Sequence, residues 1–301
     1  MVYDVIIIGA GPAGMNAAVY SARSMLKTLI IGELEGGMMG EAHEICNFLS
    51  YKKILGSELA MKMKEHVESL GVEIKNERVE KITKNEIFTV KTSSNEYQAR
   101  KIIYAAGSSK NKLGLENESR LTGKGISYCA TCDAAFYKNK ITGVVGGSDA
   151  ALTAALLLAN YAEKVYIIYR QEKFFRAEPT WIKQVEENEK ITCIFNATIT
   201  ELKGEEKLEA VKLSNGEELN MDGLFIEIGS TPNTELVKEL GVELEEGRIK
   251  VDKYKRTNIK GLFAAGDVTN TPLKQVITAA ADGAIAARKA FEEVKSEGGL
   301  K

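Results

Sequence analysis

The sequence predicts an α/β protein with two three-layer β-α-β domains, the second inserted into the first. Two observations predict this fold: a strand–glycine turn–helix–strand pattern occurs twice, and turn-rich crossings flank the second copy. The 301 residues are enough for two domains with separate cores. We expect an outer domain of residues 1–111 and 230–301 and an inserted domain of residues 112–229.

The first β-α-β unit begins at the N-terminus. An apolar, β-branched run leads into G-x-G-x-x-G at Gly9, Gly11 and Gly14, followed by a small-residue helical stretch and a second apolar run at Thr28–Ile31. In this motif the first glycine permits the tight turn, the second lets a pyrophosphate approach, and the third lets the helix pack on the strand. Glu33 follows 19 residues after Gly14, where an acid binds a ribose hydroxyl.

The second β-α-β unit lies in mid-chain, at residues 140–170. KITGVVGGSDAALTAALLLANYAEKVYIIYR repeats the order of strand, glycine turn, Ala/Leu-rich helix and strand. One glycine motif alone is weak evidence, but two motifs in complete β-α-β context strongly predict two Rossmann-like, FAD/NAD(P)-binding domains.

The remaining elements complete these domains. A buried strand at Lys101–Ser109 ends in a small-residue turn, and another apolar strand ends at Asp267. Runs at Glu86–Val90 and Ala210–Leu213 predict antiparallel strands, and Lys274–Val294 has helical periodicity.

Composition excludes several classes of partner. The net charge of −2 gives no electrostatic reason to expect nucleic acid or an acidic membrane. The N-terminus resembles a first strand more than a signal peptide, and no apolar run reaches the roughly 18 residues of a membrane helix. Four cysteines in a chain of this length do not form a secreted disulfide scaffold, so we expect a reducing, cytoplasmic location.

The string CATCD places Cys129 and Cys132 two residues apart, directly before Asp133. This spacing lowers a thiol pKa and lets the pair close into a readily reduced disulfide, so we expect the pair to cycle between disulfide and dithiol. A zinc site needs four ligands, but Cys46 and Cys193 form no second pair and are expected to be small buried hydrophobes; no metal is predicted. Asp133 is expected to serve as an acid/base for these thiols, as a helix N-cap, or as both.

GAGPAG at Gly9, CATCD at Cys129, GG-x-x-A-A at Gly146 and FAAGDV at Phe263 occur in this order along the chain. In these motifs the chain resembles the low-molecular-weight thioredoxin reductases over essentially its whole length. The resemblance implies FAD in the outer domain, and NADPH and the redox disulfide in the inserted one. It also implies a thioredoxin-like small redox protein as partner, and a homodimer.

The resemblance also assigns residues to each cofactor. Those for FAD are Gly9, Gly11, Pro12, Ala13, Gly14, Gly32, Glu33, Gly36, Gly37, Met38, Asn47, Val79, Ala106, Gly107, Gly266, Asp267, Lys274, Gln275 and Val276. Those for NADPH are Gly146, Gly147, Ser148, Asp149, Ala150, Arg170 and Arg176. Met38 stands where the family has Gln, and Lys274 where it has Arg.

The second nucleotide site departs further from the family. Ser148 replaces the glycine whose bare backbone faces the pyrophosphate, and Gln171 replaces an arginine, so Arg170 and Arg176 alone remain to bind a 2′-phosphate. Glu172 lies close to where an NADH-type acid would act. The electron donor is therefore predicted as NADPH, with NADH, ferredoxin or a reduced deazaflavin left open.

The family mechanism implies that Cys132 accepts electrons from the flavin and that Cys129 attacks the disulfide of the partner protein, with Asp133 moving protons. A rotation about the crossings near Asn111 and Gly229 would bring the nicotinamide and the disulfide to the flavin in turn. Tyr128 either shields the flavin or packs. A redox sensor that signals through the disulfide without turnover is a further alternative.

Overall fold

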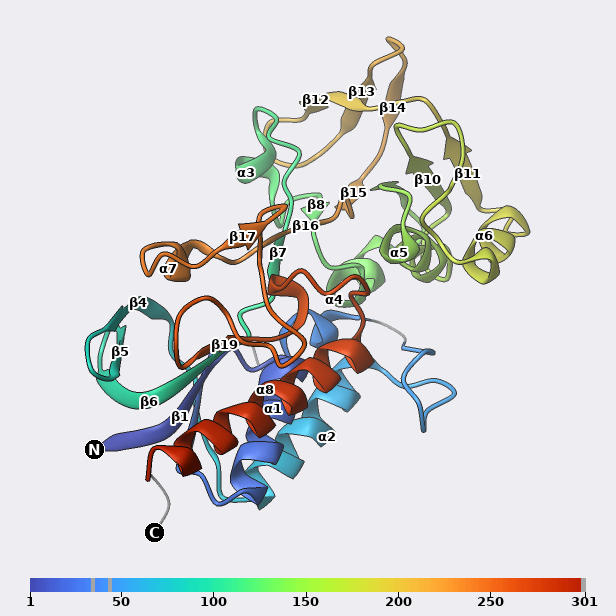
Figure 1. Ribbon diagram of the computed structural model, residues 1–301. Coiled ribbons are helices and arrows are strands. Elements are labelled where there is room, and N and C mark those ends of the chain that lie inside the picture. The colour runs from blue at the N-terminus through green and yellow to red at the C-terminus, as the bar shows by residue number, and fades with distance from the viewer. Residues whose placement is uncertain (34–35, 43–44, 299–301) are drawn as a thin grey trace. The chain divides into compact units, whose positions relative to one another are not determined.

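The computed structural model describes residues 1–33, 36–42 and 45–298 (Figure 1). The chain divides into two compact units: unit 1 comprises Met1–Ser109 and Pro232–Lys301, and unit 2 comprises Lys110–Thr231. These limits differ by two residues at each crossing from the predicted 1–111, 112–229 and 230–301. At the crossings β7 (Ser108–Lys110) pairs with β16 (Ser230–Pro232) in a two-stranded sheet.

Unit 1 is built on a seven-stranded sheet of order β3-β2-β1-β6-β5-β4, with β19 paired to β6. Parallel pairing joins β1 to β2 and β6, and β6 to β19, whereas β4, β5 and β6 pair antiparallel. The strands are β1 (Val2–Ile8), β2 (Thr28–Ile31), β3 (Glu73–Lys75), β4 (Val79–Lys84), β5 (Phe88–Thr92), β6 (Glu96–Tyr104) and β19 (Leu262–Ala264); β17 (Leu244–Glu245) and β18 (Arg248–Ile249) form a separate ribbon.

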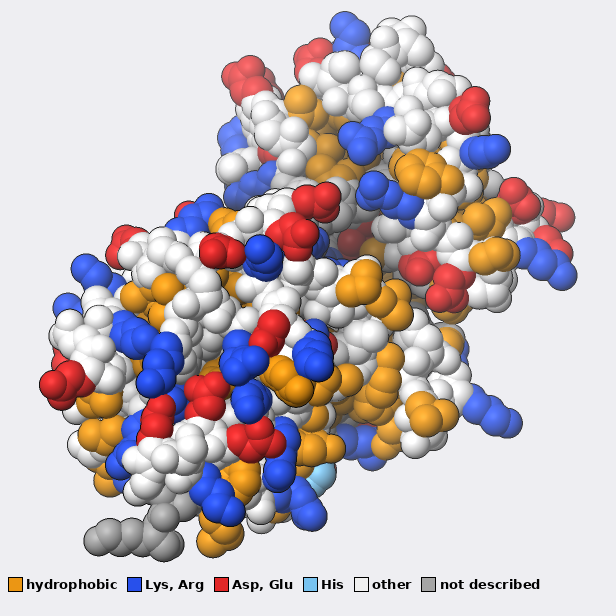
Figure 2. All heavy atoms as spheres, in the orientation of Figure 1, with side chains coloured by type: hydrophobic (Ala, Val, Ile, Leu, Met, Phe, Trp, Pro, Cys, Tyr) orange, Lys and Arg blue, Asp and Glu red, His pale blue; other side chains and the backbone are white. Residues whose placement is uncertain are grey.

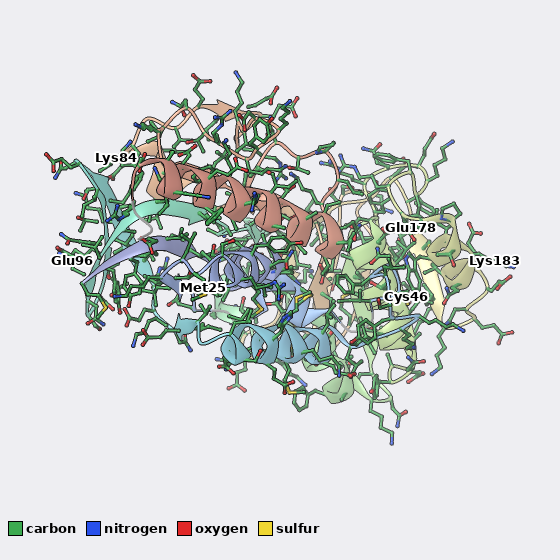
Figure 3. All side chains as sticks on the ribbon, turned by 60° about the horizontal axis from the view of Figure 1, so that its bottom comes forward. Met25, Cys46, Lys84, Glu96, Glu178 and Lys183 are labelled. Atoms are coloured by element: carbon green, nitrogen blue, oxygen red, sulfur yellow. A yellow bond between two sulfur atoms is a disulfide. The ribbon has the colours of Figure 1, made fainter. Side chains whose placement is uncertain are left out.

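Helices cover one face of this sheet. The helical segments are α1 (Pro12–Arg23), η1 (Gly37–Glu41), α2 (Gly56–Ser69), α7 (Glu235–Lys238), η3 (Gly266–Val268) and α8 (Val276–Ser296). Figures 1 and 3 show α1 and α8 side by side, and a Cβ on Gly283 of α8 would lie 2.0 Å from the carbonyl oxygen of Ala13. Val5 and Ile7 pack with α1, α2 and α8, whereas Ile6 and Ile8 pack in a second cluster that includes Val237 of α7, so β1 is buried on both faces.

Unit 2 contains a five-stranded parallel sheet of order β11-β10-β9-β15-β8. Its strands are β8 (Ile126–Ser127), β9 (Ile141–Val145), β10 (Lys164–Ile168), β11 (Ile191–Ile194) and β15 (Gly223–Ile226). The helical segments are α3 (Glu118–Leu121), α4 (Ala130–Asp133), η2 (Ala134–Tyr137), α5 (Asp149–Ala159) and α6 (Pro179–Glu186). An antiparallel sheet of β12 (Ile199–Lys203), β13 (Ala210–Leu213) and β14 (Glu218–Asn220) packs in a second hydrophobic cluster.

Three sequence expectations need correction. The strand predicted from Glu86 begins at Phe88, because Asn85 and Ile87 close a turn. The C-terminal helix begins at Val276, so Lys274 lies outside it. Cys46 is exposed and not buried as expected, because it lies in an irregular segment between η1 and α2.

Cys193 is half-buried in β11, so the prediction of a buried hydrophobe is only partly met. Burial, together with the charge of Glu186, raises the pKa of its thiol to about 11.

The surface carries mixed charge: Lys and Arg side chains are interspersed with Asp and Glu on the face shown in Figure 2. Within residues 1–33, 36–42 and 45–298, no helix combines the length and apolarity needed to cross a bilayer. Among the same residues, no group of three or more His, Cys, Asp or Glu side chains is arranged to hold a metal ion.

Candidate active site

The residues predicted to bind FAD gather at the carboxyl edge of the unit 1 sheet. Gly9, Gly32, Ala106 and Asp267 follow closely on the ends of β1, β2, β6 and β19, which are parallel neighbours. In open α/β sheets the crevice beyond these ends is where nucleotides bind. Glu33, next to Gly32, is exposed at this edge.

The fold requires a glycine at two of the three glycine positions of the first turn. Gly9 has φ +110°, and a Cβ there would lie 2.3 Å from the carbonyl oxygen of Ala105. A Cβ on Gly14 would lie 1.9 Å from the oxygen of Gly9, so the fold itself requires both glycines. A Cβ on Gly11 would meet Gly37 Cα at 3.8 Å and the carbonyl oxygen of Gly36 at 3.9 Å, which are ordinary van der Waals contacts. The protein therefore has room for a Cβ at Gly11.

The start of α1 is available to an anion. Gly11 is the N-cap and makes no side-chain capping bond, and Pro12 is the first helical residue. The free N–H groups of the first turn, including those of Ala13 and Gly14, therefore point toward the crevice. This cradle, which a Cβ at Gly11 would fill, fits the pyrophosphate of FAD.

The second predicted glycine pair lies against this turn. The N–H of Gly36 donates to the carbonyl of Ala10 at 2.9 Å, and a Cβ on Gly37 would lie 3.2 Å from Gly11 Cα. Gly266 also closes on the turn, since its Cβ would lie 2.9 Å from that of Ala13.

Other predicted FAD residues are linked to one another across the chain. Asn47 Nδ2 donates to Gln275 Oε1 at 3.1 Å, although the two are 228 residues apart. Ser108 Oγ lies 3.7 Å from Met38 Sδ, near the turn of Ala106 and Gly107. Val79 is buried in a core cluster of unit 1.

Asn233 was missed by sequence reasoning, yet it fixes the turn that follows β6. Its side-chain amide donates to the carbonyl of Ala106 at 2.9 Å, and its backbone N–H donates to that of Gly107 at 3.0 Å. Tyr104 donates in turn to the carbonyl of Asn233. A turn-rich string, S-T-P-N-T, was the only sequence signal.

Asp267 lies in η3 among cationic side chains. Burial raises the pKa of its carboxyl group above the usual value, although the charges of Lys274 and Arg248 oppose this. Arg248 donates to the backbone carbonyl of Asp267, and Lys274 donates to that of Thr269 at 2.5 Å. Burial also lowers the pKa of Lys274.

A buried ion pair between Asp282 and Lys255 lies next to η3. Asp282 of α8 is 5% exposed, pairs with Lys255 at 2.6 Å, and accepts hydrogen bonds from Gly266 N–H and Thr271. Sequence reasoning missed both charged residues. The available signal was an Asp within an alanine-rich helix, because a charge on an apolar face needs a partner.

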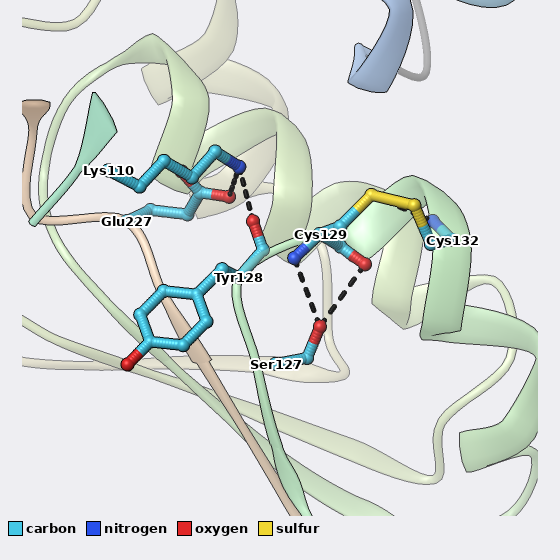
Figure 4. The surroundings of a disulfide bond; sticks show 6 residues. All are labelled: Lys110, Ser127, Tyr128, Cys129, Cys132 and Glu227. Atoms are coloured by element: carbon cyan, nitrogen blue, oxygen red, sulfur yellow. Dashed lines mark hydrogen bonds and ion pairs between the residues drawn. A yellow bond between two sulfur atoms is a disulfide. The ribbon is translucent and has the colours of Figure 1, made fainter. Parts of the chain in front are cut away.

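The predicted redox pair forms a disulfide, Cys129–Cys132, at the start of α4 (Figure 4). Cys132 is exposed and Cys129 is half-buried. Cys129 is the N-cap of α4, and its Sγ accepts the N–H of Cys132 at 3.2 Å. Ser127 Oγ accepts the N–H of Cys129 at 3.0 Å and donates to the Cys129 carbonyl at 3.3 Å. A thiolate at Cys129 would be stabilised by the same N–H of Cys132.

Asp133 ends α4, beside the disulfide, and is half-buried. It occupies the N-cap position of η2 but makes no side-chain capping bond, so the capping alternative is not realised. Burial and the nearby charge of Asp133 raise the pKa of Tyr137.

Tyr128 packs with the hydrophobic cluster that includes β13 and β14. Its hydroxyl donates to Glu118 Oε1 at 2.5 Å. Burial, and to a smaller extent this hydrogen bond, raise the pKa of Tyr128. Of the two roles considered for this side chain, packing is the one that its contacts within unit 2 support.

The second glycine turn follows β9 in unit 2. Gly146 has φ +144°, and a Cβ there would lie 2.2 Å from the carbonyl oxygen of Glu227. A Cβ on Gly147 would lie 2.5 Å from the ring of Tyr169, so this glycine is needed by packing. Ser148 is the N-cap of α5 and makes no capping bond, which leaves the helix start open to an anion.

The side chain of Asp149, in the first turn of α5, accepts the N–H of Glu178 at 2.6 Å. This bond ties the helix start to the loop that carries the predicted phosphate-binding arginines, while Ala150 follows inside the helix. Arg170 and Arg176 are both exposed, and Arg176 lies 5.5 Å from the centre of the Phe175 ring.

Comparison with known proteins gives consistent results. A family model described as pyridine nucleotide-disulphide oxidoreductase matches residues 3–283. A thioredoxin reductase of Bacillus subtilis is 41% identical over 295 residues, which cover 95% of this chain and 93% of that protein. The crystal structure of Lactococcus lactis thioredoxin reductase is 40% identical, with a TM-score of 0.94, and covers 98% of this chain and 99% of that one.

A crystal structure of a ferredoxin-flavin thioredoxin reductase from Clostridium acetobutylicum is also similar. It is 35% identical, with a TM-score of 0.55, and covers 98% of this chain and 99% of that one. These likenesses confirm the predicted fold class of two Rossmann-type domains, and membership implies flavin, nicotinamide and disulfide chemistry. The chain thus belongs to the pyridine nucleotide-disulphide oxidoreductases, among the low-molecular-weight thioredoxin reductases.

Proposed function

We propose that this protein reduces the disulfide of thioredoxin, or of a similar small redox protein, through Cys129 and Cys132, with FAD as cofactor and NADPH as electron donor. The observation that carries the proposal is the disulfide itself. Its Cys132 is exposed, and Cys129 Sγ accepts a backbone N–H, in a chain with two dinucleotide-binding units. We further propose that unit 1 binds FAD, that unit 2 binds NADPH, and that the protein acts in the cytoplasm as a homodimer.

Unit 1 would hold FAD at its carboxyl edge. The first-turn N–H groups of α1 would bind the pyrophosphate, Glu33 would bind a ribose hydroxyl, and Asp267 would contact the flavin half. When bound, FAD supplies the two-electron chemistry that links a nicotinamide to a disulfide.

The chain's own thiols complete the reaction by exchange. The Cys129 thiolate attacks one sulfur of the partner's disulfide, forming a mixed disulfide and releasing the other sulfur as a thiolate. Cys132 then attacks Cys129 Sγ, which restores the Cys129–Cys132 disulfide and releases the partner as a dithiol. Asp133, beside Cys132, would deliver and remove protons at these sulfurs.

The test is an anaerobic titration of the flavin-loaded protein with NADPH and NADH in parallel, followed by oxidised thioredoxin. The proposal expects bleaching of the flavin by NADPH and recovery of its colour when thioredoxin is added. A Cys132→Ser variant is the control, because it keeps the FAD site but cannot re-form the disulfide. A reducible flavin that reduces no protein disulfide would instead favour the redox-sensor alternative.

A different electron donor is the second candidate. Ser148 occupies the place of a bare glycine, and Glu172 lies beside the two remaining arginines. The similar Clostridium protein is described as ferredoxin-flavin dependent. If neither NADPH nor NADH bleaches the flavin while reduced ferredoxin or a reduced deazaflavin does, this candidate replaces NADPH.

A further inference from the structure

The redox turn begins where its strand has little support from the sheet. β8 contains only Ile126 and Ser127, which pair with β15, and Ile126 also forms an isolated bridge with Thr122. β8 is also the last strand in the sheet order. Tyr128 therefore lies one residue beyond the ladder, and its carbonyl needs another donor.

A side chain supplies that donor. Lys110 Nζ donates to the carbonyl oxygen of Tyr128 and lies 3.3 Å from Glu227 Oε1 (Figure 4). The Lys110 and Glu227 side chains are 20% and 11% exposed, so water screens the pair only in part. Lys110 lies in β7 and Glu227 directly follows β15, so residues 117 positions apart meet at the peptide before Cys129.

A second contact restrains the same residue from its other end. Glu118, 3% exposed, accepts the Tyr128 hydroxyl at 2.5 Å and the N–H groups of Leu113 and Gly114 at 2.8 and 2.7 Å. Because Ser127 accepts the Cys129 N–H and Lys110 donates to the Tyr128 carbonyl, both polar atoms of the Tyr128–Cys129 peptide group are anchored. The backbone of Cys129 is thus held by side chains where the sheet no longer holds it.

We infer that Lys110 and Glu227 are positioning residues for the redox disulfide, acting on Cys129 through the carbonyl of Tyr128. The inference rests on the redox role proposed for Cys129 and Cys132 and deepens it. An anchored Cys129 keeps the two thiols of the dithiol form close, which lowers the entropy lost when the disulfide closes. Without the anchor, disulfide formation is less favourable and the reduction potential of the pair rises.

The experiment measures the thiol–disulfide equilibrium directly. The full-length, flavin-loaded protein is equilibrated anaerobically with reduced and oxidised dithiothreitol at a series of ratios, quenched with acid and alkylated. Trypsin then releases residues 125–138, which contain both redox cysteines and no other cysteine, for mass spectrometry. This measurement requires neither nicotinamide nor turnover of thioredoxin. Failure of the proposed function can therefore be distinguished from failure of the positioning role of Lys110 and Glu227.

We expect Lys110→Met to reduce the equilibrium constant for disulfide formation by about three- to tenfold; a tenfold change corresponds to ~30 mV. Lys110→Arg should restore most of the wild-type value, since it keeps the charge and the donor. Lys112→Met is the matched control: Lys112 is exposed two residues away, and the same change of charge and side chain there should have no effect.

If the Lys110–Glu227 ion pair had only a structural role, a different result would be expected. Lys110→Met removes one ion pair of the half-buried Glu227, and the double variant with Glu227→Gln should recover thermal stability. If Lys110 positions Cys129, the altered equilibrium constant persists in the double variant although stability recovers. An equilibrium constant for Lys110→Met equal to that of Lys112→Met, or one that returns to normal in the double variant, would overturn the inference. Should Lys110→Met not fold, the equilibrium constant of the folded double variant tests the inference in its place.

Discussion

Gly11→Ala separates what the fold requires of the first glycine turn from what a ligand requires. The new Cβ would make only ordinary contacts, with Gly37 Cα at 3.8 Å and Gly36 O at 3.9 Å, whereas a Cβ on Gly14 would lie 1.9 Å from the carbonyl oxygen of Gly9. The backbone at Gly11 (φ −83°, ψ −175°) is extended and suits alanine. We therefore expect the first substitution to perturb the proposed pyrophosphate site and the second to perturb the protein itself.

The magnitudes differ accordingly. For Gly11→Ala, the loss of a preferred N-cap costs about 0.5–1 kcal/mol, and the reduced entropy of the unfolded chain offsets about the same amount. The free energy of unfolding of the apoprotein should then stay within about 1 kcal/mol of wild type. FAD should bind roughly 10- to 100-fold more weakly, because a methyl group in the cradle costs a hydrogen bond to a charged phosphate, about 1.5–3 kcal/mol.

Gly14→Ala should instead lower the free energy of unfolding by about 1–3 kcal/mol or more, because α1 must move away from β1. The two quantities are measured by urea unfolding of the apoprotein and by quenching of flavin fluorescence on binding. If Gly11→Ala bound FAD within a factor of about two of wild type, or lost as much stability as Gly14→Ala, the assignment of a phosphate cradle to Gly11 would be wrong.

Four further substitutions test the remaining parts of the site. Cys129→Ser and Cys132→Ser should each reduce turnover with oxidised thioredoxin by about 10³-fold or more, with FAD still bound, because the two thiols act as a unit; measurable turnover near wild type by either would contradict the exchange mechanism. Asp267→Asn should stabilise the apoprotein at neutral pH and weaken FAD binding. Because burial raises the pKa of Asp267 in the folded protein, this carboxyl group contributes fully to stability below its usual pKa of 3.8. That contribution is lost as the pH rises through the folded-state pKa. Urea unfolding against pH checks this, and an equal pH slope in wild type and variant would count against it. Arg176→Gln should raise the KM for NADPH about tenfold and leave the KM for NADH unchanged. Lys173→Gln, at an exposed neighbouring residue, is the control. Equal effects of Arg176→Gln on the two nucleotides would exclude a contact with the 2′-phosphate.

Features of the site that depend on short stretches of chain can be predicted from the amino-acid sequence. The turn at Gly9–Gly14, the repeat at Gly146, and the placement of Asp267 after an apolar strand all follow from short-range patterns, because β-α-β units are encoded by periodicity and glycine position over about 30 residues. The C-x-x-C spacing similarly predicts a pair able to close, and Cys129 and Cys132 do form a disulfide.

Contacts between distant residues cannot be predicted in this way. Asn233 on the turn after β6, Asp282 with Lys255 beneath η3, and Lys110 with Glu227 beside the redox turn join residues that no local pattern relates. Cys46 shows the same limit of prediction from sequence: its residue type favoured burial, but the path of the chain leaves it exposed.

By itself, then, the sequence determined the two β-α-β units, the insertion of one into the other and a cysteine pair able to close into a disulfide, because each rests on residue types at fixed short spacing. Tertiary structure alone decided which glycines the fold demands and which it leaves open to a ligand, and which side chains hold the backbone of Cys129. The physical reason is that packing distances and buried ion pairs depend on where strands from different parts of the chain end, and only the assembled sheets fix those positions.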